Sequence, residues 1–553
     1  MKKNNNFSVG ALFFAVCLAV SGCICSQGTC PAKDKNIDRL QVGWAKRSIA
    51  VPGKCAISGQ SHIRVALGEY GPVLASALAM SNSRDAVIFV SVDVVSVRSA
   101  VYNAAIEIIK KEAPSIPVEK IIVGATHTHA GPATGAVQTS KYPNKVDIVP
   151  SEKSQAFIAR QIADAVKEAW ANRADGSIAY GYGFATVGHS RRTVYLDDVS
   201  KRLGHTPGFA INGRCIMYGK TNDDMFDGYE AGTDAFINIL YTFDKKGKLS
   251  GAVVNVPCPS QTMEAAWMYY ASFWHNVREK LADKYGEVGL ICQTGAAGDL
   301  APRQLHYTDA EYRRYQLKYS ELIEAYKKNP MKNPSGKVPE GIHMKGEVLE
   351  MMRSEDIANR IMAAFDEVLS WAKKDMQYAP ELKHEVRTLE LSRSVITEEI
   401  VQREKEYNKK FMAESFKNDG DKWAMLHHNS ILNSRRNKVN NILKRYNEEK
   451  KNPKLKTEVH VVRIGDVAFA TNRFELFLDF MHRIQGRSPF MQTFIVQLVS
   501  DQYGVGSYLA TERGEANRGY SATPYSCYVS AKGGQELVNE TVKMLKDIKA
   551  AKK

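Results

Sequence analysis

Apolar residues cluster into two units with the same order of strand, amphipathic helix and strand. The first helix is predicted over 99–112 and the second over 263–285, and each lies between two near-continuous apolar stretches. The four strands are predicted over 85–93, 120–125, 250–257 and 288–293. Apolar strands joined by a helix are typical of βαβ units in a sheet covered on both faces. The pattern predicts an α/β fold.

The segment 309–455 has a different character. It is rich in Lys and Glu, has helical periodicity, and contains one predicted strand near 386–391. Strand patterns then resume, at 458–463, 467–470 and 493–498. The sequence predicts a central mixed β-sheet flanked by helices, formed by 39–308 and 456–548, with 309–455 as a mainly helical elaboration packed on it.

The N-terminus resembles an export signal. Lys2 and Lys3 precede an apolar run that is too short to span a membrane, and Cys23 follows small residues directly after that run. This arrangement resembles the bacterial lipoprotein signal, so we expect a signal peptide over 1–22, acylation of Cys23 and a tether over 23–38. An ordinary secretory signal cleaved nearby is the alternative. Either interpretation predicts an exported protein, and the first predicts a lipid-anchored protein of the bacterial envelope.

Charge and cysteine content limit the function classes. The formal net charge of +15 suits an anionic membrane surface or an acidic substrate, and a solvated basic face is the simpler explanation. No nucleic-acid-binding motif accompanies this charge, so we expect no nucleic-acid partner. Seven of the nine cysteines lie beyond Cys23, scattered and without a CxxC pair. Neither a disulfide scaffold nor a thiolate zinc site is indicated, while one or two disulfides are left open.

Polar residues follow the predicted strands. Asp93, the pair His127 and His129, the segment Cys258-Pro259-Ser260 and the segment 295–299 each come after the carboxyl end of a strand. In open α/β sheets this edge binds ligands. Side chains two residues apart in extended backbone point the same way, so the two histidines are expected to converge on one metal ion or one substrate carbonyl. The alternative is a pair of polar residues with local hydrogen bonds.

Several ordered motifs together resemble the neutral/alkaline non-lysosomal ceramidase family. The histidine motif is Gly124-Ala-Thr-His-Thr-His-Ala-Gly-Pro132, and it is followed by Gly295-Ala-Ala-Gly-Asp299. The late motifs are Gly465-Asp466 with Glu475-x-Phe477, Ser488-Pro489-Phe490, Gly506-x-Tyr508-Leu509-x-Thr511 and Gly519-Tyr520. The resemblance extends from about Val42 to Ile548 with a poorly matching middle. The β-sandwich that follows the catalytic domain in full-length ceramidases is not expected here.

The resemblance implies a zinc amidase that cleaves the N-acyl bond of ceramide-like lipids to a free amine and a fatty acid. It implies His127, Glu475 and Tyr520 as zinc ligands and His129 as the residue that binds substrate or stabilises the oxyanion. It also implies that Arg191 and Arg192 line the catalytic site. From their positions after strands, Asp93 and Asp299 are expected to support the site from behind.

Two departures from the family pattern affect this expectation. The family has a second zinc-binding histidine after a strand, where this chain has Pro259, which has no group to coordinate a metal. A family segment that usually carries Asp reads Ser272-Phe-Trp-His275 here. His275 or His189 are candidates to fill the gap. Either zinc is held by fewer or substituted ligands, or metal binding and catalysis are weakened or lost.

The sequence thus leaves three functions open. The first is an exported metal-dependent hydrolase of ceramide-like N-acyl amides. The second is a non-catalytic or weakly metal-binding surface protein of the same fold. The third is a deacylase that acts on another amide, such as an N-acyl amino sugar.

Overall fold

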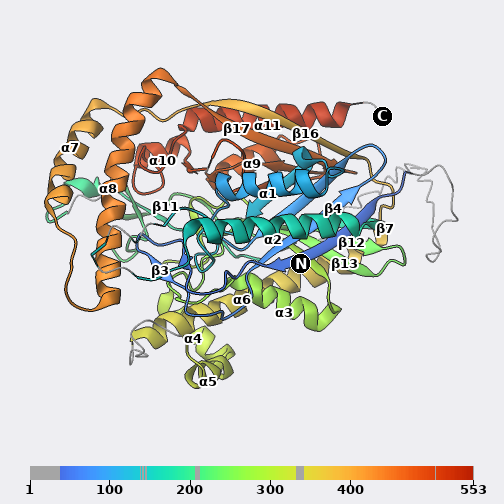
Figure 1. Cartoon of the computed structure of the whole chain (residues 1–553), viewed down its shortest axis with the longest axis horizontal. Coiled ribbons are helices and arrows are strands. Elements are labelled where there is room, and N and C mark those ends of the chain that lie inside the picture. The colour runs from blue at the N-terminus through green and yellow to red at the C-terminus, as the bar shows by residue number, and fades with distance from the viewer. Residues whose placement is uncertain are drawn as a thin grey trace, which may run out of the picture. The chain divides into compact units, whose positions relative to one another are not determined.

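The apolar strands form a mixed eight-stranded sheet in the computed structural model (Figure 1). The structure describes residues 38–551 apart from 138, 140–141, 144–145, 206–211, 332–341 and 505, so the predicted signal peptide, Cys23 and nearly all of the tether lie outside it. The strands, in spatial order, are β14 (Gly289–Thr294), β13 (Leu249–Val256), β12 (Phe236–Asp244), β7 (Ala174–Phe184), β1 (Gln41–Ser48), β4 (Leu74–Ser81), β5 (Ala86–Val92) and β6 (Ile121–Ala125). The pairs β5–β6 and β13–β14 are parallel and the others antiparallel, which confirms the predicted mixed sheet and both βαβ units.

This sheet consists of two four-stranded halves that meet at a short junction. Strands β1 and β7 are paired only at Gln41 with Asp175 and Val42 with Ala174. The outer strand β14 returns to the other half, where the Cys292 amide donates to Ser91 Oγ at 3.3 Å. This curvature brings the carboxyl ends of β5, β6, β13 and β14 close together although they belong to opposite halves.

A second sheet packs on the first. It contains β16 (Leu382–Ser392), β17 (Lys454–Ile464), β18 (Val467–Thr471) and β20 (Gln492–Val496), in that order. The rings of Phe89 and Phe469 lie 4.7 Å apart between the sheets, and Phe494 stacks on Phe469 at 4.3 Å. The late strands were predicted at the correct positions. The sequence did not predict that these strands form a separate sheet. This second sheet covers one face of the first, where helices were expected on both faces.

Helices cover the outer faces of both sheets. Helices α1 (Ser99–Glu112) and α2 (Ser151–Ala171) pack on the β1–β4–β5–β6 half, while α3 (Phe273–Tyr285) and α6 (Ile342–Ala372) pack on the other half. Figure 1 shows α1 and α2 side by side and α11 (Ala531–Ala550) along β16 and β17. The buried apolar residues of α11 and of α9 (Leu478–Gln485) join the core of the second sheet. The architecture is helix, sheet, sheet, helix, held by burial of apolar faces.

Among its described residues, the region 309–455 has four further helices besides α6. They are α4 (Thr308–Lys318), α5 (Ser320–Lys328), α7 (Glu398–Ala413) and α8 (Lys422–Lys451). Helices α7 and α8 pack against each other, while α6 and β16 belong to the main core. Part of this charged region is therefore integral to the layers.

The helix predicted over 263–285 begins only at Phe273. Met263 and Ser272 have positive φ angles of 60° and 59°, a conformation that cannot continue a right-handed helix. Among the described residues no helix combines the length and the apolar character needed to cross a membrane. The five cysteines of the described chain, Cys55, Cys215, Cys258, Cys292 and Cys527, are buried free thiols.

The remaining elements are short, and their strands form small separate sheets. The strands are β2 (Ala56–Ile57), β3 (Arg64–Val65), β8 (His189–Ser190), β9 (Arg192–Tyr195), β10 (Cys215–Met217), β11 (Phe226–Tyr229), β15 (Leu300–Ala301), β19 (Glu475–Leu476) and β21 (Tyr508–Leu509). The helical segments are α10 (Glu512–Asn517) and the 3-10 turns Val118–Lys120, Val199–Lys201 and Lys373–Asp375.

We predict that Gly43→Ala destabilises the protein by about 1–3 kcal/mol. A Cβ at this position of β1 would lie 2.1 Å from the Ala169 carbonyl oxygen of α2, so the helix would have to move away from the sheet. Urea unfolding monitored by circular dichroism measures the change. Gly232→Ala is the control, because nothing lies within 4 Å of the Cβ it adds, and its effect is expected within about 0.5 kcal/mol. Equal stability of the two variants would contradict the packing argument.

Candidate active site

The two histidines follow β6, but not in extended backbone. His127 has a φ of 63°, in the left-handed region that residues other than glycine seldom adopt. The two side chains therefore do not point the same way through the i, i+2 alternation of extended backbone, as we expected from the sequence. The rings still converge, with 3.5 Å between the two Nε2 atoms. Strained backbone of this kind is common where a side chain must be aimed at a functional site.

The ring of His127 is fixed by one hydrogen bond. Its Nδ1 lies 2.8 Å from the Val95 carbonyl oxygen, which can only accept, so Nδ1 carries the proton and donates. Burial lowers the pKa of His127 to about 4, with the Glu475 carboxylate opposing that shift. The ring is therefore neutral near pH 7, and the lone pair of Nε2 faces the site.

Glu475 meets His127 from a segment some 350 residues later in the sequence. Its Oε2 lies 3.4 Å from His127 Nε2. The second sheet brings it there, because the Ser500 amide after β20 donates to the Val123 carbonyl of β6 at 2.8 Å. Glu475 in β19 is also paired in parallel with Tyr508 in β21. The segments that carry His127, Glu475, Ser500 and Tyr508 therefore lie close together.

Two tyrosines of the late motifs also belong to the site. Tyr508 and Tyr520 contact each other edge to face with ring centroids 5.6 Å apart, and both line a cavity of about 430 Å³ together with His127 and Glu475. Burial and the neighbouring Glu475 carboxylate raise the pKa of both phenols. The two hydroxyls are therefore protonated and able to donate hydrogen bonds. Tyr508 belongs to a motif noted in the sequence but was not predicted as a site residue.

Two further residues missed by the sequence analysis hold His129. Gln261 Nε2 lies 2.8 Å from His129 Nε2, and a Glu264 carboxylate oxygen lies 3.4 Å from His129 Nδ1. Although burial opposes it, the contact with His129 lowers the pKa of Glu264. His129 therefore reaches the edge of the site with its Nε2 engaged by Gln261 and its Nδ1 beside the Glu264 carboxylate. Gln261 and Glu264 lie two and five residues after Pro259, so the departure at Pro259 is the sequence signal that pointed to this loop.

No histidine takes the place expected at Pro259. His275 lies on α3 with its Nε2 3.3 Å from Glu279, and charged residues of the 309–455 region surround His189. Neither belongs to the cavity wall as the described residues define it. Cys258 is buried, and burial raises the pKa of its thiol, which disfavours the thiolate needed for metal coordination.

Arg191 and Arg192 lie behind the tyrosines rather than on the cavity wall. Arg191 Nη2 donates to the Gly298 carbonyl at 2.7 Å and to the Tyr508 hydroxyl at 3.1 Å. Arg192 donates to the backbone carbonyls of Tyr520 at 2.5 Å and Arg518 at 2.6 Å. These contacts fix the positions of the two phenols.

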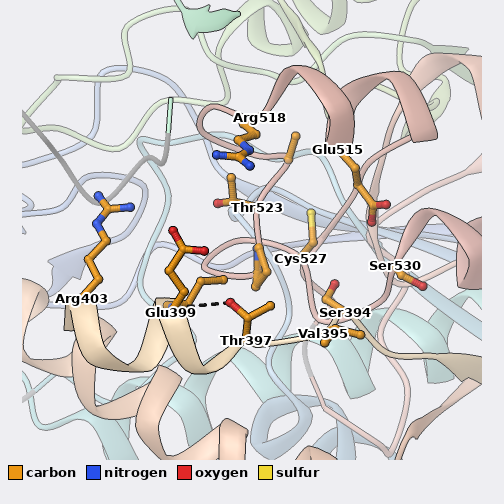
Figure 2. Close-up of a pocket in the computed structure, with 13 residues that line it drawn as sticks. Ser394, Val395, Thr397, Glu399, Arg403, Glu515, Arg518, Thr523, Cys527 and Ser530 are labelled. Carbon is orange, nitrogen blue, oxygen red and sulfur yellow. Dashed lines mark hydrogen bonds between the residues drawn. The ribbon is translucent and has the colours of Figure 1, made fainter. Parts of the chain in front are cut away.

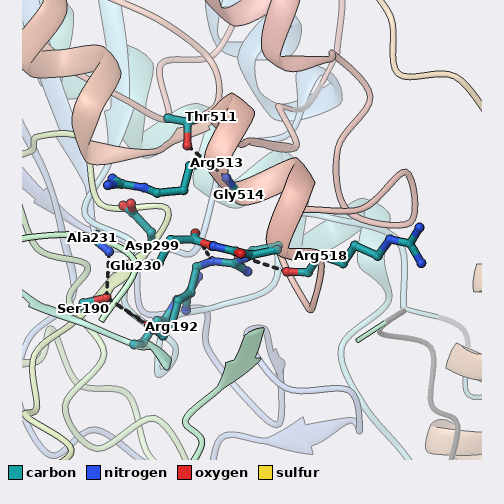
Figure 3. A network of polar contacts seen from close by, with 12 residues as sticks. Ser190, Arg192, Glu230, Ala231, Asp299, Thr511, Arg513, Gly514 and Arg518 are labelled. Carbon is teal, nitrogen blue, oxygen red and sulfur yellow. Dashed lines mark hydrogen bonds and ion pairs between the residues drawn. The ribbon is translucent and has the colours of Figure 1, made fainter. Parts of the chain in front are cut away.

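A buried ion pair anchors Arg192. Figure 3 shows its guanidinium against Glu230, with Nε 2.5 Å and Nη2 3.0 Å from the two carboxylate oxygens. Both side chains are almost fully buried. Asn517 at the end of α10 donates to the same carboxylate at 3.0 Å. The pair thus connects β9 to the segment that carries Tyr520.

Asp93 supports the histidine loop. It forms an ion pair with Arg278 of α3 at 2.7 Å and accepts a hydrogen bond at 3.2 Å from Thr126, the residue before His127. It also accepts from the Leu74 amide at 2.9 Å.

Asp299 supports the other side of the site. It accepts from the Leu478 amide at the start of α9, at 3.0 Å. A Cβ on the neighbouring Gly298 would lie 2.3 Å from the Glu475 carbonyl oxygen, so this loop needs glycine to approach β19. Burial raises the pKa of Asp299 to about 7.

The donor set at this point fits a divalent cation. Among the described residues no group of three or more His, Cys, Asp and Glu side chains could hold a metal ion, and the third ligand expected here, Tyr520, is not one of these residue types. A neutral imidazole lone pair and a carboxylate oxygen repel each other at 3.4 Å unless a proton or cation lies between them. Two ligand atoms that each lie ~2.0 Å from a tetrahedral zinc ion are about 3.3 Å apart.

Comparison with known proteins defines the fold. No protein-family model and no curated protein sequence matches this chain. A neutral ceramidase from Pseudomonas aeruginosa shares its architecture with a TM-score of 0.58 and 16% identity, over 92% of this chain and 74% of that chain. A ceramidase complexed with C2 has a TM-score of 0.58 and 14% identity, over 92% of this chain and 75% of that chain. The chain has a mixed α/β fold, and specifically the fold seen in the neutral ceramidase structures. The family resemblance seen in the motifs is confirmed for the fold.

We predict that Asp299→Asn flattens the pH dependence of stability. The buried carboxyl has a pKa near 7 in the folded protein, raised by burial and by Glu230 and lowered by Leu478 and Arg192, against about 3.9 unfolded. The folded state therefore holds a proton that the unfolded state has lost, and the free energy of unfolding falls as pH rises from about 4 to 7. The asparagine has no such proton.

Urea unfolding at pH 5 and pH 8 tests this. The stability of Asp299→Asn relative to the unmodified protein should rise by on the order of 2 kcal/mol between these pH values. Asp224→Asn, at an exposed position, is the matched control and should show no such trend. A parallel pH profile for Asp299→Asn and the unmodified protein would contradict the assignment.

Proposed function

We propose that the protein is an exported metal-dependent amidohydrolase that cleaves an N-acyl amide of the ceramide type into a free amine and a fatty acid. The observation that carries the proposal is the 3.4 Å approach of His127 Nε2 to Glu475 Oε2, beside Tyr520 in an open cavity. The ceramidase-like fold supports the reaction class.

Zinc is the proposed ion, with His127, Glu475 and Tyr520 as its ligands. When bound, it would polarise the amide carbonyl and lower the pKa of a water molecule towards neutrality. The Val95 carbonyl keeps His127 in the tautomer that a ligand needs. Arg191 donates to the Tyr508 hydroxyl from behind, and the protonated phenol contacts the Glu475 carboxylate at the cavity wall.

His129 is proposed as the substrate-side residue. Gln261 occupies its Nε2, and the Gln261 Oε1 atom is buried without a hydrogen-bond partner. Rotating this amide by 180° exchanges the two atoms, so that Oε1 accepts from His129 Nε2–H. In either orientation of the Gln261 amide, His129 contacts substrate only by exchanging its hydrogen bond with Gln261. This supports a role for His129 in orienting the substrate rather than in binding the metal.

A non-catalytic relative is the second candidate. Its support is the loop after β13, where Pro259 provides no ligand and Gln261 engages the remaining histidine. A deacylase of N-acyl amino sugars is the third, supported by the four tyrosines of the cavity wall, since aromatic rings can pack against sugar faces.

Export and lipid anchoring complete the proposal. Acylation of Cys23 would attach the protein to the bacterial envelope through a tether over 23–38. Substitution of Cys23 by Ala in the expressing bacterium should abolish labelling by a radioactive fatty acid and release the protein from the membrane fraction. Unchanged labelling would exclude Cys23 as the lipidation site.

We predict that His127→Ala and Glu475→Gln each lose both zinc and activity. Each substitution removes a proposed ligand, and even residues one contact further from a metal are typically worth 10–100-fold in affinity or activity, so kcat/KM should fall by about a hundredfold or more. The measurements are metal content of the purified protein and hydrolysis of a panel of N-acyl amides, ceramide included.

His275→Ala is the matched control, because it removes a half-buried histidine that lies away from the cavity. It should leave metal content and turnover unchanged. Stoichiometric zinc without hydrolysis of any amide would favour the non-catalytic candidate. Full turnover in Glu475→Gln would refute the assigned site.

A further inference from the structure

A second cavity shares a segment of its wall with the candidate active site. It has a volume of about 390 Å³ and is lined by residues of α7, α10 and the segment 518–530 (Figure 2). Tyr520 and Tyr525 of the same segment line the cavity at His127. Small-molecule sites have volumes of about 300–1,000 Å³, so the second cavity is large enough to bind a ligand of its own.

Two buried hydroxyl groups in the wall of the second cavity have no hydrogen-bond partner among the described residues. They are Ser394 Oγ and Thr523 Oγ1, and the two residues are only 7% and 4% exposed. A third hydroxyl of the wall is engaged, because Ser530 Oγ donates to the Ser392 carbonyl at 3.2 Å. A buried hydroxyl without a partner costs free energy. A ligand that forms hydrogen bonds with Ser394 and Thr523 would remove this cost.

Charged side chains of both signs line the second cavity. Glu399 of α7 and Glu515 of α10 contribute carboxylates, and Arg518, directly after α10, contributes a guanidinium (Figure 2). Within the described part of the chain, no ion pair or side-chain hydrogen bond joins either carboxylate to Arg518. Arg403, which lies over the Tyr407 ring, is a further cation of the wall. The cavity thus presents both charges to a ligand from separate elements.

The carboxylate of Glu515 is held by a backbone amide. Its Oε1 accepts a hydrogen bond from the Ala531 amide at 2.7 Å. Burial raises the pKa of Glu515, the Ala531 amide lowers it, and the nearby Glu512 raises it again. None of these influences comes from a cationic side chain. An ammonium group in the cavity would therefore stabilise the charged form of Glu515.

The uncharged part of the wall is partly aliphatic. Val395 and Ile400 contribute from one side of the sequence, and Ala522 and Pro524 from the other. Val395 is 75% exposed, so an apolar group that covers it would gain free energy. A lone anion in this cavity would meet two carboxylates, and a lone cation would meet two guanidinium groups. A ligand with one charge of each sign and an aliphatic body matches the wall best.

We propose that the second cavity is a binding site for a small zwitterion with an aliphatic side chain, as presented by a free amino acid or by a short peptide with free ends. Arg518 binds the carboxylate of this ligand, and Glu399 and Glu515 bind its ammonium group. Ser394 and Thr523 add hydrogen bonds. The inference does not depend on the proposed amide hydrolysis, because none of these side chains is assigned to that reaction.

A matched set of ligands tests the inference by isothermal titration at pH 7. L-leucine and L-leucyl-L-leucine are the zwitterions, and we expect one of them to bind to each chain. The tighter of the two shows whether a free amino acid or a peptide is the better ligand. L-leucinamide lacks the carboxylate and N-acetyl-L-leucine lacks the ammonium group. Each should bind at least about tenfold more weakly than L-leucine, the effect of one lost charge-assisted hydrogen bond.

Two variants locate the binding site. Arg518→Gln should weaken binding of the tighter zwitterion at least about tenfold, and Glu399→Gln should do the same. Arg513→Gln is the matched control, because Arg513 is an exposed arginine of α10 that pairs with Asp479 at 2.7 Å and does not line the cavity. It should leave the affinity unchanged. Thermal unfolding of each variant checks that it is folded.

Three results would overturn the inference. The first is no binding of either zwitterion up to about 10 mM, well above the ~1 mM dissociation constant of a weak ligand. The second is equal affinity for L-leucine, its amide and its N-acetyl derivative, which would exclude recognition of both charges. The third is full affinity in both Arg518→Gln and Glu399→Gln, which would place binding elsewhere. Because these titrations need no turnover, a protein without amidase activity would still test the inference.

Discussion

The hydrogen bond from His127 Nδ1 to the Val95 carbonyl is the constraint on which the candidate site depends. It turns Nε2 towards Glu475, and it does so from backbone held in the left-handed region. Such backbone costs of order 1–3 kcal/mol and persists only where neighbouring contacts enforce it. Here those contacts are Asp93, which binds Thr126 and pairs with Arg278, and the loop after β13, where the Ser260 amide donates to the Thr126 carbonyl at 3.2 Å.

The opposite side of the site, which carries Glu475 and Tyr520, is held by other contacts. One side chain, Gln497, accepts from the amides of Ala297 and Leu476 at 3.1 and 2.9 Å, and so joins the glycine loop to the strand that carries Glu475. Arg192 then ties Tyr520 to Glu230 in the interior. Replacement of a buried ion pair by apolar residues is often neutral or stabilising, so its contribution to stability is not its best explanation. Its guanidinium satisfies two backbone carbonyls of an irregular segment, which an apolar residue could not do.

How much of the structure could be predicted from the sequence depends on whether a pattern is local or joins distant segments of the chain. Continuous apolar runs located β5, β6, β13 and β14, and Ser99–Glu112 was predicted at its observed bounds, because these patterns are local. The sheet-on-sheet packing of Phe89 with Phe469 is a contact between distant segments, and periodicity carries no information about it. The residues of the site were found through motifs. Gln261 and Glu264 were not, since their contact with His129 depends on the unforeseen irregular segment before Phe273.

The position of Arg191 explains how such a site can be assembled before any metal binds. Glu475 and two phenols are gathered in a buried place where an uncompensated carboxylate would be costly. Arg191 is buried beside them, bonded to Tyr508, and its pKa stays well above the usual value despite burial, because Tyr508, Tyr218, Glu475 and Tyr520 all favour the charged form. Its charge compensates the carboxylate from behind, which leaves the cavity side of Glu475 free for a cation.

Metal binding at such a site need not be coupled to folding of the whole chain, in contrast to small domains that fold only around their metal. Loss of one ligand at Pro259 would then weaken the metal site without weakening the fold, so the chain can tolerate that proline whichever of the candidate functions it serves.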